Sequence, residues 1–221
     1  MASSSAALKL PTSNEDVLAH LPVSGTMEYW PHQLIYGPKS LSQSIYLVMQ
    51  GNVVVSRVAD DGSELLMEIV RPDELFGESA FLEPSRRFEQ AKAMDRDTVM
   101  AWAVSDIEVL VTKRPRLAVA LLQVFAQRNA ELTRRIQSFA ADNIQQRLAR
   151  SLLRLSERLG TPEEDGSVRM MPFTHALLSQ YVGTSREIVT LHMNRFRKQG
   201  YVNYSRDRIL LYRDTLRKVL D

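Results

Sequence analysis

The stretch FTHALLSQYVGTSREIVTLHMNRFRKQGYVNY, residues 173–204, decides the fold of the C-terminal part of the chain. Apolar residues recur at helical spacing over 174–182, and Gly183 then breaks this first helix with a turn. The run TSRE at residues 184–187 has the pattern of a capping box, which opens a second helix that Gly200 ends. The core face of the second helix is expected to consist of Val189, Met193 and Phe196.

The outward face of this second helix carries polar and charged side chains at its N-terminal end. A helix that presents such an end, supported by a short first helix, fits the major groove of DNA. Two packed helices with no role in DNA binding are the alternative, because charged side chains on a helix also occur as solvated surface. The residues of this face that are expected to contact DNA are Ser185, Arg186, Glu187, Thr190 and Leu191.

The distribution of charge favours DNA as the partner. Residues 145–221 hold 14 Lys and Arg against 8 Asp and Glu, and residues 1–144 hold 14 against 18, so balances of +6 and −4 give the net charge of +2. A basic C-terminal third is suited to a phosphate backbone. The run YVNYSRDRILLY at residues 201–212 predicts a β-hairpin with a basic tip. We expect Arg206 and Arg208 at this tip to contact phosphate beside the helix.

The composition excludes several classes of function. The chain has no cysteine, which rules out disulfides, cysteine-ligated zinc, iron–sulfur clusters and thiol redox chemistry, and fits a cytoplasmic location. No apolar run reaches membrane-spanning length, and residues 1–16 indicate a flexible tail without the apolar core of a signal peptide. The four histidines are scattered, and no phosphate loop or nucleophile motif occurs. We therefore expect no enzyme, no catalytic residue and no metal site.

Residues 17–113 have the pattern of a β domain. The run IYLVMQGNVVVSRVADDGSELLMEIV at residues 45–70 contains three strand-like segments separated by tight turns, and QAKAMDRDTVMAWAV at 90–104 adds another pair. Several short strands linked by tight turns indicate an antiparallel barrel or roll. Between these runs, the residues FGE at 76–78 lead into a short helical turn at 79–82, whose N-terminal amides would be free to hold an anion.

A long helical stretch follows from about residue 114 to 159, with a break expected near Asp142 and Asn143. Two heptad ladders in its first part form a seam of the kind through which a helix pairs with its own copy. We expect residues 114–141 to form a dimerisation helix, and a helix packed on its own domain is the alternative. The ladders are Ala118, Phe125, Leu132 and Phe139, and Leu122, Asn129, Ile136 and Asn143. A later repeat belongs to the expected core of a DNA-binding domain over 142–221: Leu148, Leu152, Leu155 and Leu159.

The motifs, taken in this order, resemble one family of regulators. The run RPDELFGE at 71–78 precedes the long helix, and VGTSREIV at 182–189 with RFRKQGYV at 195–202 follows it. Over about residues 20–215 the chain resembles the cyclic-AMP receptor protein (CRP/FNR) family of bacterial transcription regulators. The resemblance implies an α+β fold, with an N-terminal antiparallel β-roll of the cyclic-nucleotide-binding type, a long dimerisation helix and a C-terminal winged helix-turn-helix.

The same resemblance implies roles for the second helix of the helix-turn-helix. Ser185 matches a serine that contacts phosphate, Arg186 an arginine that reads guanine, and Glu187 a glutamate that accepts a hydrogen bond from cytosine. Where the family often has a second arginine, this chain has Leu191, which could meet a thymine methyl. The implied function is a homodimeric, sequence-specific transcription regulator. Its implied partners are palindromic double-stranded DNA, a second copy of the chain and RNA polymerase, with no membrane.

The effector site of the family carries over only in part. Members that bind cyclic AMP use a Gly-Glu pair and then an Arg followed by Ser or Thr, whereas here Phe88 and Glu89 follow the arginine. A phenyl ring removes a donor and a carboxylate repels phosphate, so tight binding of cyclic AMP is not expected. No cofactor is certain, and a cyclic nucleotide is the candidate effector. The candidate effector residues are Gly77, Glu78, Ser79, Arg86, Arg87, Asn129 and Thr133. A nucleotide-sensing module whose C-terminal domain binds a protein is the alternative function.

Overall fold

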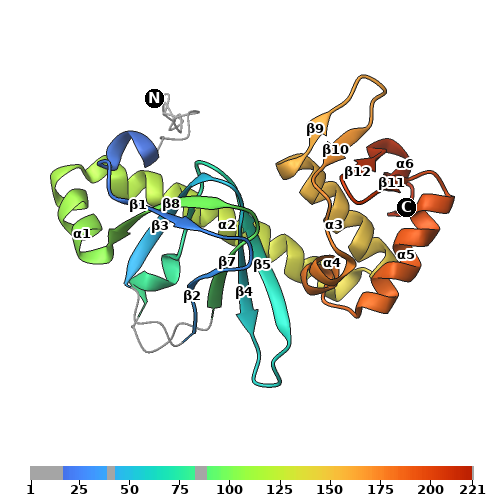
Figure 1. Cartoon of the computed structure of the whole chain (residues 1–221), viewed down its shortest axis with the longest axis horizontal. Coiled ribbons are helices and arrows are strands. Elements are labelled where there is room, and N and C mark those ends of the chain that lie inside the picture. Colours follow the sequence, from blue (N-terminus) through green and yellow to red (C-terminus); the bar gives the residue numbers. More distant parts are fainter. Residues whose placement is uncertain (1–16, 39–42, 83–88, 221) are drawn as a thin grey trace, which may run out of the picture.

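The computed structural model describes residues 17–38, 43–82 and 89–220. The chain folds into two lobes, and the long helix α2, Pro115–Ala141, runs along the first lobe and reaches the second (Figure 1). The first lobe is a β-roll and the second is a helix-turn-helix domain with a small sheet. The predicted α+β fold is confirmed, whereas the predicted tail at residues 1–16 lies outside the described part of the chain.

The β-roll consists of two four-stranded antiparallel sheets, ordered β1-β8-β3-β6 and β2-β7-β4-β5. Between them, Tyr36, Tyr46 and Phe76 stack with ring centroids 5.1–6.2 Å apart. The strands are β1 (Thr26–Tyr29), β2 (Leu34–Tyr36), β3 (Ser44–Gln50), β4 (Val53–Val58), β5 (Glu64–Val70), β6 (Leu75–Phe76), β7 (Glu89–Ala93) and β8 (Asp97–Ala103).

Only one of the tight turns in the roll joins two strands of the same sheet. The strands β4 and β5 form a hairpin, but β3 and β4 lie in opposite sheets, as do β7 and β8. The strands β3, β4, β7 and β8 all bury apolar side chains in the interior of the roll. The two sheets pack face to face, so each sheet covers the apolar side chains of the other. The strand segments were therefore predicted correctly, while their pairing follows from contacts between distant parts of the chain.

Helices close one end of the roll and lead out of it. The 3₁₀ helix η1 (Val17–His20) and α1 (Val104–Lys113) pack against the start of α2, where Leu117 and Leu121 join a core with Ile45 and Trp102. The predicted break is confirmed, because α2 ends at Ala141 and Asn143 caps the next helix, α3 (Ile144–Leu159). The backbone N–H of Gln146 donates to the side-chain oxygen of Asn143 at 3.0 Å, and the backbone N–H of Asn143 donates to the side-chain oxygen of Gln146 at 3.2 Å.

The second lobe is a winged helix-turn-helix, as predicted. Its sheet has the order β11-β12-β10-β9, and its predicted core residues Val189, Met193 and Phe196 are buried with Leu148 and Leu152 of α3. The same core takes in side chains from β5 of the roll, so the two lobes share a packed interface. The elements are β9 (Thr161–Pro162), β10 (Val168–Met170), α4 (His175–Val182), α5 (Arg186–Lys198), β11 (Val202–Tyr204), β12 (Ile209–Leu211) and α6 (Arg213–Arg217).

The predicted capping box at the start of α5 is wrong. Gly183 adopts a left-handed conformation (φ 70°), and the amides of Gly183 and Thr184 both donate to the Ser179 carbonyl, at 2.9 and 3.1 Å. Thr184 is therefore part of the turn that ends α4. The cap of α5 is Ser185, whose hydroxyl accepts from the Ile188 amide at 3.4 Å. This shift places Arg186 at the first position of the helix.

Candidate DNA-binding face and effector cavity

The side chains at the N-terminal end of α5 are exposed and could enter the major groove of DNA. Ser185, Arg186 and Glu187 are exposed, and so is Leu191 one turn further on. Among the described residues, the Arg186 guanidinium has no hydrogen bond or ion pair, so all its donors are available for a base. Backbone amide and Ser185 hydroxyl donors lower the pKa of Glu187, which keeps this carboxylate ionised as an acceptor. The arrangement suits a guanine and a cytosine amine.

The hydroxyl of Thr190, also predicted to contact DNA, makes two contacts within the domain. Its hydroxyl donates to the Arg186 carbonyl at 2.8 Å and lies 2.8 Å from Nδ1 of His175, at the start of α4. Because the only hydroxyl proton goes to the carbonyl, Nδ1 of His175 must carry the proton of the second bond. Burial, and then the nearby Arg186 charge, lower the pKa of His175, so this ring is neutral at pH 7. Thr190 thus ties α5 to α4.

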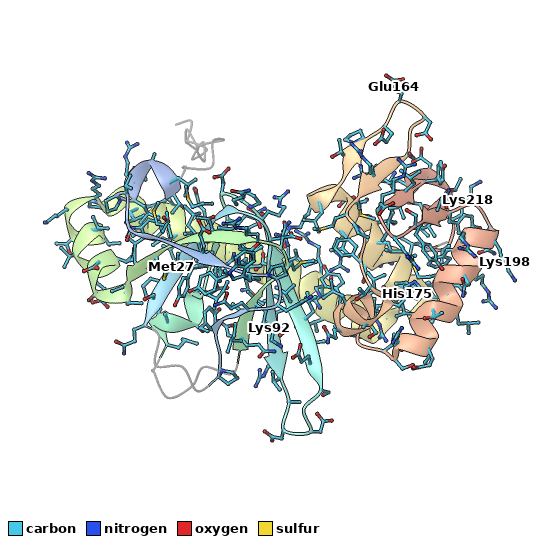
Figure 2. The ribbon with its side chains drawn as sticks, viewed as in Figure 1. Met27, Lys92, Glu164, His175, Lys198 and Lys218 are labelled. Carbon is cyan, nitrogen blue, oxygen red and sulfur yellow. The ribbon has the colours of Figure 1, made fainter. Side chains whose placement is uncertain are left out.

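His175 packs at the contact between α4 and the rest of the domain. Its ring meets the edge of Tyr204 with centroids 5.5 Å apart, and Tyr204 donates to the Asn194 side chain at 3.0 Å. Arg197 lies 5.2 Å above the Tyr204 ring. The three elements α4, α5 and β11 are locked together by these contacts, and Figure 2 shows His175 where α4 faces α5. The sequence signal for these contacts is Tyr204, an aromatic residue in the first strand of the predicted hairpin.

The predicted basic hairpin tip is present beside α5. Strands β11 and β12 pair antiparallel, and the Ser205 amide donates to the Arg208 carbonyl across the turn at 2.9 Å. Arg206 and Arg208 are both exposed at this tip. Further basic side chains follow at the other end of α5, where Figure 2 shows Lys198 on the outside of the lobe. The domain therefore carries cations at the hairpin tip and at the C-terminal end of α5, which suits contacts with phosphates.

A cavity of about 210 Å³ lies between the roll, α2 and the second lobe. Arg128 of α2 fills part of it, with its guanidinium 2.8 Å from Glu78 and 3.1 Å from Glu68. The same guanidinium donates to the Leu75 carbonyl, and only 13% of the Arg128 side chain is exposed. The carboxylate that is expected to hold a ribose is thus already paired with a cation of its own chain.

A second arginine connects the cavity to the DNA-binding lobe. Arg158, in the last turn of α3, lies 3.2 Å from Glu68, 2.9 Å from Glu74 and 3.7 Å from Glu131. Burial raises the pKa of Glu68, while the charges of Arg128 and Arg158 oppose that rise. Breaking one side of such a buried network leaves an uncompensated charge, which costs about 3–5 kcal/mol. The network therefore fixes the position of α3 relative to the roll.

The structure places the predicted effector residues in three different surroundings. Gly77, with φ 86°, leads into the 3₁₀ helix η2 (Glu78–Phe81), where the Ser79 hydroxyl donates to Glu89 at 2.6 Å. Arg86 and Arg87, with Phe88, lie outside the described residues. Asn129 and Thr133 are exposed on the far side of α2 and do not line the cavity of their own protomer, although Thr133 donates to the Asn129 carbonyl at 2.9 Å.

The residues that α2 does present to the cavity were missed in the sequence. Three of them, Arg128, Glu131 and Arg135, repeat at a spacing of three or four and lie about 100° or more around the helix from the exposed Asn129 and Thr133. Arg135 donates to the carbonyls of Met67, Leu66 and Tyr181, at 2.5, 2.9 and 3.1 Å, and burial lowers its pKa. The cavity residues of α2 are Arg128, Glu131, Leu132, Arg134 and Arg135.

The described residues contain neither a metal-binding cluster nor a membrane-spanning helix. Within residues 17–38, 43–82 and 89–220, no group of three or more His, Cys, Asp or Glu side chains could hold a metal ion. In the same described ranges, no helix combines the length and the apolar character that a membrane crossing needs.

A roll of this type, a long helix and a winged helix-turn-helix with a free basic recognition end together define a class of DNA-binding transcription regulators. Comparison with known families agrees: residues 26–116 match the cyclic nucleotide-binding domain, and residues 146–219 match the Crp-like helix-turn-helix domain. The chain belongs to the CRP/FNR family of transcription regulators.

Individual relatives extend over most of the chain. The transcriptional regulator SdrP of Thermus thermophilus is 31% identical over 169 residues, which is 75% of this chain and 78% of that protein. A CRP-like cAMP-activated global transcriptional regulator of Mycobacterium tuberculosis is 29% identical over 176 residues, 76% of this chain and 75% of the relative. The crystal structure of a CRP/FNR-family regulator from Thermus thermophilus superposes with a TM-score of 0.69 at 29% identity, covering 88% of this chain and 97% of the other.

Proposed function

We propose that this regulator binds palindromic double-stranded DNA as a homodimer and reads base edges with the N-terminal end of α5. The observation that carries the proposal is the exposed Arg186 at the first position of that helix, with every guanidinium donor free. Ser185 and Glu187 flank it, and Arg206 and Arg208 supply phosphate contacts from the hairpin. A bidentate arginine–guanine pair contributes about 1–3 kcal/mol of discrimination between bases.

An exposed apolar stripe on α2 supports the homodimer. Leu122 and Ile136 are 66% and 67% exposed, and Leu132 and Phe139 are exposed on the same face. These four side chains belong to the two heptad ladders of the predicted seam. A stripe of this kind on a soluble helix is buried most simply by an identical helix. The α2 helices of two protomers would then hold two recognition helices about 34 Å apart, one turn of DNA.

The function is tested by selection of DNA from a random library with the full chain. The expected product is an inverted repeat with half-sites centred about 10 base pairs, or one helical turn, apart. Enrichment of a single, asymmetric half-site would contradict the homodimer, and absence of any enrichment above a bead-only control would contradict sequence-specific binding. RNA polymerase is the partner we propose for transcription from such sites.

We further propose that cyclic AMP is not required for DNA binding. Cyclic AMP would need Glu78 for its ribose, and here Arg128 pairs with Glu78 at 2.8 Å and with Glu68 at 3.1 Å. The ligand would have to displace this arginine, and Phe88 replaces the hydroxyl residue that would hold the phosphate. Loss of one charge-assisted hydrogen bond alone weakens binding about tenfold or more.

The test is a titration of the full chain with cyclic AMP, followed by DNA binding with and without the nucleotide. Operator affinity is expected to be the same in both cases for the wild type. A Phe88→Ser variant, which restores the hydroxyl, is the matched comparison and is expected to bind cyclic AMP more tightly. Micromolar binding by the wild type together with stronger operator binding would refute this proposal.

A further inference from the structure

A second hollow, of about 470 Å³, lies at the junction of α2 and α3, outside the roll. Figure 1 shows this junction between the two lobes, where the dimerisation helix leads into the first helix of the DNA-binding domain. Three arginines and two carboxylates line the hollow: Arg134, Arg150, Arg154, Asp142 and Glu157. Its volume falls in the range of small-molecule sites, about 300–1,000 Å³.

The positive charge of this hollow is not balanced. Asp142 is already neutralised, because Arg150 contacts its two carboxylate oxygens at 2.8 and 3.2 Å and the Ser138 hydroxyl donates to it. Arg150, and less strongly Arg154, hold the pKa of Asp142 below its usual range. Glu157 is exposed at the rim and makes no ion pair within the described chain. Arg134 and Arg154 therefore remain for a ligand against the single carboxylate of Glu157, which leaves the hollow with an excess of one positive charge.

Arg154 is the more unusual of these two arginines. Its Nη1 atom is buried and has no hydrogen-bond partner within the described chain. The charge of Arg154 also adds to burial in lowering the pKa of the neighbouring Arg135, whose hydrogen-bond acceptors here are backbone carbonyls rather than carboxylates. A half-buried guanidinium beside a second, buried one is costly unless an anion compensates them.

The hollow stays open when two α2 helices pair, provided that the proposed dimer seam is correct. Each residue of an α-helix is rotated by about 100° from the last, so Arg134 lies about 160° around α2 from both Leu132 and Ile136. Arg134 thus faces away from the seam, and a second protomer docked along the seam does not cover it. The other wall is formed by α3 and Leu220 of the same chain.

We propose that this hollow binds a small polyanion, a metabolite with two or more phosphate or carboxylate groups. Arg134 and Arg154 would each donate charge-assisted hydrogen bonds to it, and the paired Arg150 would line the same side. Such a ligand touches both α2 and α3. Arg134, Arg154 and Glu157 line both this hollow and the cavity that holds Glu78 and Arg128, so the two spaces adjoin. Asp142, Arg150 and Leu220 line the hollow and not the cyclic-nucleotide cavity of the roll.

The probe is inorganic pyrophosphate, titrated into the full-length dimer by calorimetry at constant ionic strength. We expect one site per protomer with a dissociation constant below about 1 mM, and a loss of about tenfold or more in affinity in both Arg134→Gln and Arg154→Gln. Arg134 is exposed, so its variant tests the site without altering the buried interior. Thermal unfolding of Arg154→Gln checks that the fold is retained.

Two controls locate the bound anion. Arg217→Gln removes an exposed arginine that already pairs with Asp214 at 3.3 Å, and it is expected to bind pyrophosphate like the wild type. The double variant Arg206→Gln/Arg208→Gln removes the cations of the hairpin tip and is also expected to bind normally. Absence of binding by the wild type, or an equal loss of affinity in the hairpin variant, would overturn the proposal. Sedimentation of the same samples reports the dimer separately, so failure of the seam is distinguishable.

Discussion

The exposed stripe on α2 allows the strength of the dimer contact to be predicted for a single side chain. Ile136 is 67% exposed in the protomer and lies between Leu132 and Phe139 in the stripe. Full burial of an isoleucine stabilises by about 1.5–3 kcal/mol, so covering two thirds of it contributes about 1–2 kcal/mol. Twofold symmetry places Ile136 in the seam twice. The variant Ile136→Ala should therefore weaken association by about 2–4 kcal/mol, or roughly 30- to 700-fold in Kd.

Sedimentation equilibrium over a wide range of concentrations measures this dissociation constant directly. Gln137→Ala is the matched control, because it truncates the next residue of the same helix, also exposed, on a face turned away from the seam. The control should associate like the wild type, and circular dichroism should show equal helix content in all three proteins. An unchanged dimer in Ile136→Ala, or equal weakening in Gln137→Ala, would refute the assignment of the stripe as the interface.

Two further predictions concern the stability of the lobes. Gly183 is left-handed (φ 70°), and in Gly183→Ala the new Cβ lies only 2.8 Å from Phe139, so the free energy of unfolding should fall by more than the about 1–2 kcal/mol that backbone strain alone costs. Gly200→Ala is the control, because Gly200 has φ 72° and nothing within 4 Å of its added Cβ, so this variant should show the backbone strain alone. Equal losses of stability in the two variants would contradict the clash with Phe139. Burial raises the pKa of Asp97 from 3.8 to about 6, and one of its carboxylate oxygens has no hydrogen-bond partner in the described chain. Because the folded state therefore favours the protonated acid, the free energy of unfolding of the roll should fall by about 3 kcal/mol as the pH rises from about 4 through 6. Asp97→Asn should remove that part of the pH dependence in chemical unfolding, and an unchanged profile would show that Asp97 does not ionise in this range.

Local patterns in the sequence located some elements of the fold, whereas α1, β9, β10 and α6 were not predicted. Periodicity located α4, α5 and the break before α3, because the buried face of each helix repeats within a few residues. Heptad spacing located the stripe on α2 for the same reason. The pairing of strands was not accessible in this way, because β3 and β4 are neighbours in sequence but belong to opposite sheets.

The candidate site was predictable only where its residues are close in sequence. Arg186 and Glu187 follow directly from the turn, and the structure places them at an exposed helix end. Arg158 lies 84 and 90 residues from the glutamates that it contacts, and no local pattern relates these positions. The predicted effector residues Asn129 and Thr133 lie on another face of α2 than the residues that line the cavity of their own protomer, since a shift of one residue rotates a side chain by about 100° and separates Arg128 from Asn129.

Base reading by α5 depends on the exposed guanidinium of Arg186. Competition binding of wild type and Arg186→Ala would be measured on the selected duplex and on the same duplex with one G·C pair of each half-site exchanged. We predict that Arg186→Ala loses about 1–3 kcal/mol on the selected duplex and no longer distinguishes the exchanged pair, while binding to random DNA changes little. An equal loss of affinity on selected and random DNA would contradict the account, because it would show that Arg186 contacts only phosphate.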